Sequence, residues 1–388
     1  MKIRALDGDG HVEEWEETFS DAYLEPAFRD RRPQVIETGE FEHDYTWLID
    51  GKTVRVGGSP SSKNGVVSTE YEKMAHWRGP HESGEFHTAK DRLAVMDAEN
   101  TLLSVNYPTL LLRWPIADDP ALNRAITRAY NNWVADISSQ APDRLKWVTV
   151  IDPSDPAEAA REIERTKQMG SVGIMVFGDY GPKGLDHPDF HPIWATAEAT
   201  GMSVNVHPGF GAVDAMRAFP SVAGDQFLTS VVRGFKTITS SGLLDRYPKV
   251  TVSFQETGCT WVDFAVEAMD FTLDNIRDRI RIGTVRKEHK AIIERGLPEM
   301  TPLEYIKAGR VYLGFEVDDQ LLPYMVSKYG VDCWTYASDI PHAHRKPDAA
   351  NMLLKRKDMP EGAAARMLVE GTASLYGLDI PAGAGVTA

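Results

Sequence analysis

The sequence predicts an α/β protein whose eight parallel strands close into a (β/α)8 barrel, the TIM-barrel fold. Short apolar runs rich in β-branched residues alternate with longer amphipathic stretches over most of the 388 residues, which is typical of a parallel sheet covered by helices. Eight such runs qualify as strands, and eight is the number that this barrel needs. The glycine-rich phosphate-binding motifs of open nucleotide-binding sheets are absent from the sequence, so we favour the closed barrel over a doubly wound sheet.

The expected strands and helices follow one another regularly along the chain. The strand candidates are residues 3–6, 101–107, 145–151, 172–177, 203–207, 250–254, 311–315 and 333–337. Amphipathic stretches between them predict helices at residues 157–169, 192–200, 229–243 and 261–277. Pro156 stands where a helix can begin, and Gly201 stands where a helix commonly ends.

Residues 12–90 interrupt this alternation. They are rich in charge, glycine, proline and aromatic side chains and show no coherent apolar period, so we expect a lid or insertion after the first strand rather than a separate domain. Residues 1–378 then form one distorted barrel domain. From residue 379 onward the small residues predict a flexible C-terminal tail.

Composition narrows the class of protein. There are 57 acidic and 42 basic side chains, and the formal charge of −15 argues against binding to nucleic acid or to an anionic membrane surface. The two cysteines, Cys259 and Cys333, exclude a disulfide framework and fit a reducing compartment. Neither a signal-peptide pattern nor a membrane-length apolar run occurs, so we expect a soluble, cytoplasmic protein.

Polar side chains follow four of the predicted strands. Asp9 and His11 close the first strand, where positions two apart face the same side. His207, Glu256 and Asp339 follow the fifth, sixth and eighth strands, and a parallel barrel gathers such positions at its C-terminal face. Carboxylate and imidazole together suit zinc, and also manganese or iron. We therefore predict a site for one or two divalent ions, with zinc first.

Each of these residues also has a simpler interpretation when it is taken alone. Asp9 stands between glycines and can make a local turn, His207 can be a hydrogen-bonded loop residue, and Asp339 can cap the segment that follows it. The metal site is favoured because the groups occur together at the ends of four strands that share one barrel face.

Several segments of the chain resemble the amidohydrolase superfamily, in the amidohydrolase-related branch that includes aminocarboxymuconate semialdehyde decarboxylase and resorcylate-type decarboxylases. The similar segments are residues 92–100, 130–133, 184–209, 241–258 and 337–342, with VEGTASLYGL near the C-terminus resembling the closing helix. The resemblance implies a metal-dependent barrel enzyme and a homodimer.

The resemblance also implies roles for individual residues. Asp9, His11, His207 and Asp339 would be the metal ligands, and Asp339 would also handle the catalytic proton. The chain departs from the family pattern in having Asp-x-His in place of His-x-His, and in having Glu256 where relatives often carry a histidine. This glutamate is interpreted either as a catalytic or metal-binding group or as a residue that orients His207.

Two reactions and one non-catalytic role remain open. Hydrolysis of a small cyclic or aromatic organic acid derivative would use a metal-activated water with Asp339 as general base. Non-oxidative decarboxylation of an aromatic or unsaturated carboxylic acid would use an acid that protonates carbon. We place hydrolysis first, because Glu256 adds negative charge that would repel a carboxylate substrate. A non-catalytic binding barrel is the third hypothesis, and the four retained ligands argue against it.

Candidate substrate contacts complete the prediction. His342, Arg113, Arg217 and Trp47 are the residues that we expect to line the substrate pocket, with Lys236 as a further basic candidate. Tyr71 and Trp77 accompany Trp47 in the predicted lid, where aromatic side chains can either face a planar substrate or pack the lid down. Trp133 is considered as a surface residue that contributes to a dimer.

Overall fold

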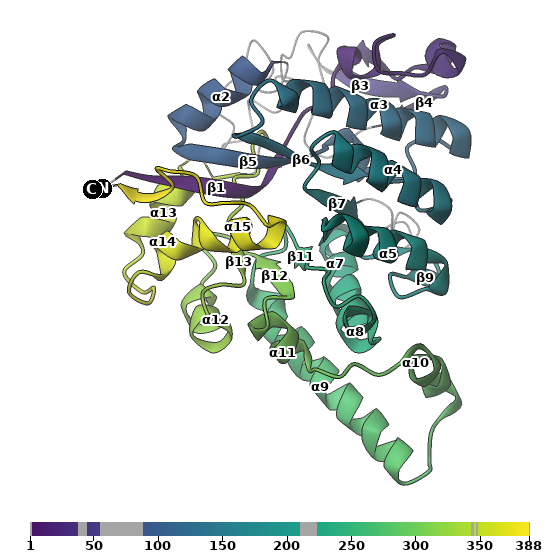
Figure 1. Cartoon of the computed structure of the whole chain (residues 1–388), viewed down its shortest axis with the longest axis vertical. Helices are drawn as coiled ribbons and strands as arrows, with labels where there is room; N and C mark the ends of the chain where they lie inside the picture. The colour runs from purple at the N-terminus through teal and green to yellow at the C-terminus, as the bar shows by residue number, and fades with distance from the viewer. Residues whose placement is uncertain are drawn as a thin grey trace.

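The eight predicted strands are present in the computed structural model, which describes residues 2–37, 45–54, 88–209, 223–342, 345–346 and 348–387. They pair in parallel as a nearly closed barrel (Figure 1). In order around the barrel, the strands are β1 (Lys2–His11), β5 (Thr101–Tyr107), β6 (Leu145–Val150), β7 (Gly173–Val176), β10 (Ser203–Val206), β11 (Val252–Phe254), β12 (Val311–Gly314) and β13 (Trp334–Thr335). The (β/α)8 fold class predicted from the sequence is confirmed.

The strands are continuous apolar runs because both of their faces are covered. Every residue of β5, β7, β10 and β12 is buried, which is typical of parallel sheets packed between a barrel interior and outer helices. The first and last strands meet where the backbone N–H of Gly8 donates to the carbonyl of Tyr336 at 2.8 Å. This contact brings the end of β1 beside the loop that follows β13.

Helices follow most of the strands and cover the outside of the barrel. They are α2 (Ala89–Ala98), α3 (Pro120–Ser139), α4 (Pro156–Gln168), α5 (His191–Thr200), α7 (Ala223–Ser240), α8 (Leu243–Arg246), α9 (Thr260–Arg281), α10 (Lys290–Arg295), α11 (Pro302–Lys307), α12 (Leu322–Tyr329), α13 (Ala349–Lys355), α14 (Ala363–Met367) and α15 (Glu370–Tyr376). The predicted boundaries hold for α4 and α5: Pro156 is the first residue of α4, and Gly201 ends α5 with φ +65°.

The stretch predicted as an insertion contains short elements of its own. The 3-10 helices η1 (Glu16–Phe19) and η2 (Pro26–Arg31) precede a small antiparallel sheet of β2 (Gln34–Glu37), β3 (Tyr45–Ile49) and β4 (Lys52–Val54). Trp47 of this sheet packs edge-on against Phe19, with ring centroids 5.5 Å apart.

The C-terminal segment differs from the expected flexible tail. Strand β14 (Gly385–Thr387) pairs antiparallel with the start of β1, where Lys2 lies opposite Thr387. The two ends of the chain therefore lie side by side (Figure 1). The physical reason is that the first residues of β1 present unpaired backbone groups, which a further strand can satisfy.

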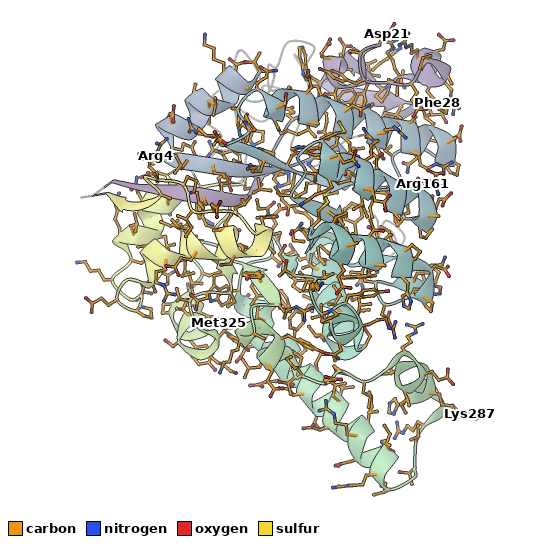
Figure 2. The ribbon with its side chains drawn as sticks, viewed as in Figure 1. Arg4, Asp21, Phe28, Arg161, Lys287 and Met325 are labelled. Carbon is orange, nitrogen blue, oxygen red and sulfur yellow. The ribbon has the colours of Figure 1, made fainter. Side chains whose placement is uncertain are left out.

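Helix α9 is the longest helix among the described residues, and its second half runs away from the barrel (Figure 1). The return segment with η7 (Lys287–His289) and α10 forms the end of this projection, which carries the labelled Lys287 in Figure 2. Neither α9 nor any other described helix combines the length and the apolar character that a membrane span requires.

Candidate metal centre

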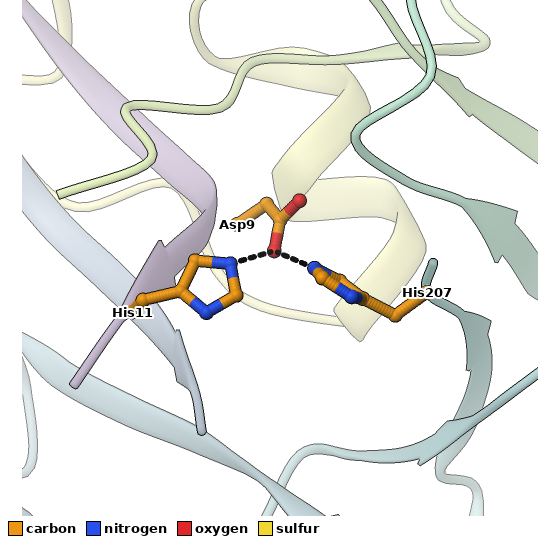
Figure 3. Close-up of side chains that lie close together, drawn as sticks. All are labelled: Asp9, His11 and His207. Atoms are coloured by element: carbon orange, nitrogen blue, oxygen red, sulfur yellow. Dashed lines mark ion pairs between the residues drawn. The ribbon is translucent and has the colours of Figure 1, made fainter. Parts of the chain in front are cut away.

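Three donor side chains converge at the C-terminal end of the barrel (Figure 3). Asp9 and His11 come from β1, and His207 directly follows β10. Oδ1 of Asp9 lies 3.6 Å from Nε2 of His11 and 3.6 Å from Nε2 of His207. These three residues are at most 1% exposed, and their donor atoms lie close enough together to hold one metal ion.

The hydrogen bonds of the two histidines leave one nitrogen of each ring facing the centre. Nδ1 of His11 lies 2.8 Å from the carbonyl of Pro108, and Nδ1 of His207 lies 2.7 Å from the carbonyl of Pro208. A carbonyl oxygen only accepts, so each Nδ1 carries a hydrogen and each Nε2 is the ring nitrogen that faces the centre.

The converging atoms fit a cation. Both carboxylate oxygens of Asp9 and the Nε2 atoms of His11 and His207 are buried and have no hydrogen-bond partner among the described residues. A buried polar atom without a partner costs about 1–3 kcal/mol. A divalent ion would satisfy all of these atoms with the nitrogen and oxygen ligands that zinc, manganese and iron accept.

Asp339 and Glu256 lie at the edge of this cluster and are less deeply buried. Oδ1 of Asp339 is 3.7 Å from Nε2 of His11, and Oε2 of Glu256 is 3.1 Å from Nε2 of His207. Both residues have φ of +53°, a left-handed conformation that costs a non-glycine residue about 1–3 kcal/mol. The chain therefore turns sharply after strands β11 and β13, which aims both carboxylates at the histidines.

The charges of the cluster shift the pKa values of its members. Burial raises the pKa of Asp9 to about 7, and Glu256 and Asp339 push it in the same direction. For His207, burial alone would lower the pKa, but Asp9 and Glu256 outweigh burial and raise the pKa to about 9. Burial, together with the neighbouring His342 and His207, lowers the pKa of His11 well below its usual value.

His342 connects Asp339 to the loop after β5. Its Nδ1 lies 2.5 Å from Oδ1 of Asp339, and its Nε2 lies 3.0 Å from Oγ1 of Thr109. The two contacts place the imidazole between the carboxylate and the threonine hydroxyl. A second possible ligand group, formed by His11, Asp339 and His342, shares His11 with the first.

Glu14 holds this loop in place and was missed in our reasoning from sequence. Its carboxylate is fully buried and accepts hydrogen bonds from the backbone N–H groups of Thr109 at 3.1 Å and Leu110 at 2.8 Å. The N–H of Leu111 lies at 3.4 Å. Burial raises the pKa of Glu14 to about 7. Thr109, which follows a strand end, could have been found by the rule that found His207, whereas no sequence pattern points to Glu14.

Asp7 was also missed, and it fixes the backbone on both sides of the centre. Ser338 donates to Asp7 from its backbone N–H at 2.9 Å and from its hydroxyl at 2.7 Å, next to Asp339. The backbone N–H of Asp9 lies 3.3 Å from the same carboxylate, and Ser104 donates to it at 2.8 Å. Burial raises the pKa of Asp7, while the hydrogen bond from Ser338 opposes the shift.

Gly10 is needed beside this buried network. A Cβ at position 10 would lie 2.5 Å from Oδ2 of Asp7, 2.6 Å from Nη2 of Arg92 and 2.6 Å from Oγ of Ser104. The strand pairing is irregular between Asp7 and Gly10, which separates Asp7 from the donor cluster. The sequence Asp-Gly-Asp-Gly-His thus combines a structural carboxylate with two candidate ligands.

The remaining predicted contacts are dispersed. Arg113 ends the 3-10 helix η3 (Leu110–Leu112) and is half-buried, and Trp47 is 1% exposed. Arg217, together with Tyr71 and Trp77, lies outside the described residues. Their roles as substrate contacts stay predictions. Trp133 is buried in the core, so its suggested role as a surface residue is wrong. Lys236, the further basic candidate for the substrate pocket, lies over the ring of Phe264 on the barrel exterior.

Comparison with known proteins identifies relatives of this chain. Residues 98–287 match the family model described as Amidohydrolase. The gamma-resorcylate decarboxylase of Polaromonas sp. strain JS666 is 27% identical over 186 residues, which are 43% of this chain and 55% of the relative. The chain thus spans about half the length of this curated relative.

Solved structures share the fold. An amidohydrolase from Mycobacterium avium subsp. paratuberculosis K-10 has a TM-score of 0.73 at 17% identity, covering 97% of this chain and 100% of that chain. The 5-carboxyvanillate decarboxylase of Novosphingobium aromaticivorans DSM 12444, solved with manganese and 4-hydroxy-3-methoxy-5-nitrobenzoic acid, has a TM-score of 0.61 at 20% identity. It covers 74% of this chain and 79% of that chain.

The donor groups described above could hold a divalent metal ion. The family model, the curated relative and the shared barrel also confirm the resemblance drawn from the sequence. The chain is therefore similar to the amidohydrolase superfamily, and the branch that it resembles contains these decarboxylases.

Proposed function

We propose that the protein is a metal-dependent, non-oxidative decarboxylase of a small aromatic or unsaturated carboxylic acid. The observation that carries this choice is the similarity to a resorcylate decarboxylase, in a chain whose barrel gathers two imidazoles and two carboxylates at one point. Decarboxylation was our second prediction from sequence, and the relatives favour it over hydrolysis.

The proposed ligands are Asp9, His11, His207 and Asp339. The two imidazoles and two carboxylates suit manganese, which a relative binds, as well as zinc, which the sequence led us to place first. When bound, a divalent ion would supply positive charge for the substrate carboxylate and for an oxygen next to it.

Asp339 is the proposed proton donor to carbon. Its side chain is 16% exposed, whereas the side chains of Asp9 and His207 are buried, so of these groups Asp339 is the one that a substrate can reach. Nδ1 of His342, 2.5 Å from Oδ1 of Asp339, is the group proposed to position this carboxylate. Protonation of the carbon that bears the carboxylate, followed by cleavage of the carbon–carbon bond, gives the arene and CO2. His342, Arg113, Arg217 and Trp47 remain the proposed substrate contacts.

Hydrolysis is the second candidate, and Glu256 is the observation that favours it. This carboxylate lies 3.1 Å from His207 and brings the acidic groups around the centre to three, with Asp9 and Asp339. Such a cluster is less favourable for an anionic substrate than for a neutral ester or amide, whose carbonyl a water activated by a nearby base could attack.

Isotope labelling separates the two reactions. The manganese- or zinc-loaded protein would be incubated with hydroxybenzoic acids and, separately, with their esters and amides. Each incubation would be run once in deuterated water and once in water labelled with oxygen-18. We expect CO2 release and deuterium at the vacated ring carbon, both abolished in Asp339→Asn. Oxygen-18 in a carboxylate product without CO2 release would establish hydrolysis instead. No turnover of any compound, with metal bound, would favour a binding barrel.

We also propose that the protein is a cytoplasmic homodimer with a single barrel domain over residues 1–378. The support for a single domain is that β1 and the C-terminal helices belong to one barrel: the backbone N–H of Leu6 donates to the carbonyl of Leu368 at 2.8 Å.

A further inference from the structure

Helix α9 exposes large apolar side chains far from the metal centre. Phe264 is 67% exposed, Phe271 is 74% exposed and Ile282, which caps the helix, is 65% exposed among the described residues. Among the described residues, Nζ of Lys236 lies over the ring of Phe264, 4.9 Å from its centroid, and leaves most of the ring uncovered. Exposed aromatic side chains of this size are uncommon on a surface that has no partner.

These side chains form one stripe. They are 7 and 11 residues apart, and at 3.6 residues per turn these spacings bring them back to the same face of the helix. The opposite face is the one that packs on the protein, through Val262, Val266, Leu273 and Ile276, all of them buried. Helix α9 is therefore apolar on two faces, and among the described residues only one of these faces packs against the protein.

The charges of α9 are strongly divided along its length. Residues 260–276 contain four acidic and no basic side chains, namely Asp263, Glu267, Asp270 and Asp274. Residues 277–287 contain five basic side chains and one acidic side chain. This division suits the helix dipole. It also makes the helix complementary to a second copy of itself when the two copies run in opposite directions.

We propose that the outer face of α9 is a homodimer interface in which two copies pack antiparallel about a two-fold axis that crosses this face at the level of residue 273. With the axis at residue 273, Phe264 lies opposite the partner subunit's Ile282, and Phe271 lies near the partner subunit's Asn275. The acidic half of each helix then faces the basic half of the other. Such an interface is isologous, since the same patch serves both subunits.

The charge division selects this partner and this direction. A parallel pair would place the exposed Glu267 and Asp274 of one helix against the same residues of the other, and an anionic membrane would repel these carboxylates. The second half of α9 projects beyond the barrel (Figure 1). The inference does not depend on the reaction proposed above, since α9 supplies none of the proposed metal ligands.

Sedimentation velocity or light scattering on the full-length protein tests the interface. We expect wild type to be a dimer at micromolar concentration and Phe271→Glu to have half its molar mass. The Phe271→Glu monomer should still melt cooperatively, which shows that the barrel remains folded. Ile280→Glu is the matched control, because Ile280 lies on the same helix about half a turn away from the stripe and is 41% exposed. It should remain a dimer.

A charge exchange tests the direction of packing. Glu267→Lys with Asp274→Lys brings the net charge of residues 260–276 from −4 to zero, and Arg279→Glu with Arg281→Glu brings that of residues 277–287 from +4 to zero. Each double variant should weaken self-association by about tenfold or more, and an equimolar mixture should restore dimers. A monomeric wild type would overturn the proposal, as would a dimer that survives Phe271→Glu, or a mixture that stays monomeric.

Discussion

Oε2 of Glu256 lies 3.1 Å from Nε2 of His207, on the side of the imidazole that faces the candidate metal centre. This glutamate stands where the family resemblance leads us to expect a histidine. A carboxylate at that place brings a third acidic group to the centre, beside Asp9 and Asp339.

Replacement of Glu256 should weaken metal binding. We expect Glu256→Gln to lower the affinity for manganese or zinc by about tenfold to a hundredfold, because a charged neighbour of a ligand imidazole is lost. Competition with a chromophoric chelator measures this affinity. Glu158→Gln, on the outer helix α4, is the control and should bind as wild type does. Unchanged affinity in both Glu256→Gln and Glu256→His would remove Glu256 from the centre.

Loss of a proposed ligand should abolish the coupling between metal and stability. Since metal bound only to the folded state stabilises it, added manganese should raise the melting temperature of wild type, and a chelator should reverse the increase. In His11→Gln neither addition should have an effect, and metal analysis after dialysis should find the protein free of ion. A metal-dependent shift in His11→Gln equal to that of wild type would contradict the ligand assignment.

Glu14 should make folding stability fall as the pH rises. Its pKa in the folded protein is raised to about 7 from an ordinary value of 4.5, so the folded state binds more protons between these two values. The stabilisation is complete below pH 4.5 and is lost as the pH rises through 7, with a total of about 3 kcal/mol. The difference in unfolding free energy between wild type and Glu14→Gln, measured in urea, should change by that amount.

A constant difference between wild type and Glu14→Gln across this pH range would contradict the pKa of Glu14. The same variant should also disturb the site, because Glu14 anchors Thr109 and Thr109 contacts His342. Thr109→Val, which removes only the hydroxyl, separates the contact to His342 from the anchoring of the loop.

Gly10→Ala should destabilise the fold near the centre. The added methyl would lie within 2.6 Å of Asp7, Arg92 and Ser104, and overpacking of a buried site costs about 1–3 kcal/mol. The free energy of unfolding in urea measures this cost. Gly181→Ala, which has no atom within 4 Å of the added Cβ, should show only the smaller backbone penalty of φ +66°. Equal effects of the two substitutions would exclude a steric role for Gly10.

Much of the barrel could be predicted because its strands are buried on both faces and therefore leave continuous apolar runs in the sequence. The positions of Asp9, His207 and Asp339 followed from the same geometry, since parallel strands end at one face of a barrel. The hydrogen bonds that Glu14 accepts from backbone N–H groups 95 and 96 residues later could not be predicted, because backbone donors have no sequence signature. The pairing of β14 with β1 could not be predicted either, because it too consists of backbone hydrogen bonds, here between opposite ends of the chain.

The hydrogen bond between Nδ1 of His207 and the carbonyl of Pro208 has a consequence for how the ion arrives. It confines the exchangeable proton of this imidazole to Nε2, the atom that a metal would use. Asp9 and Glu256 raise the pKa of His207 to about 9, so at neutral pH Nε2 carries a proton at the position where a metal would bind. A divalent ion bound there would displace this proton, so metal binding should acidify an unbuffered solution.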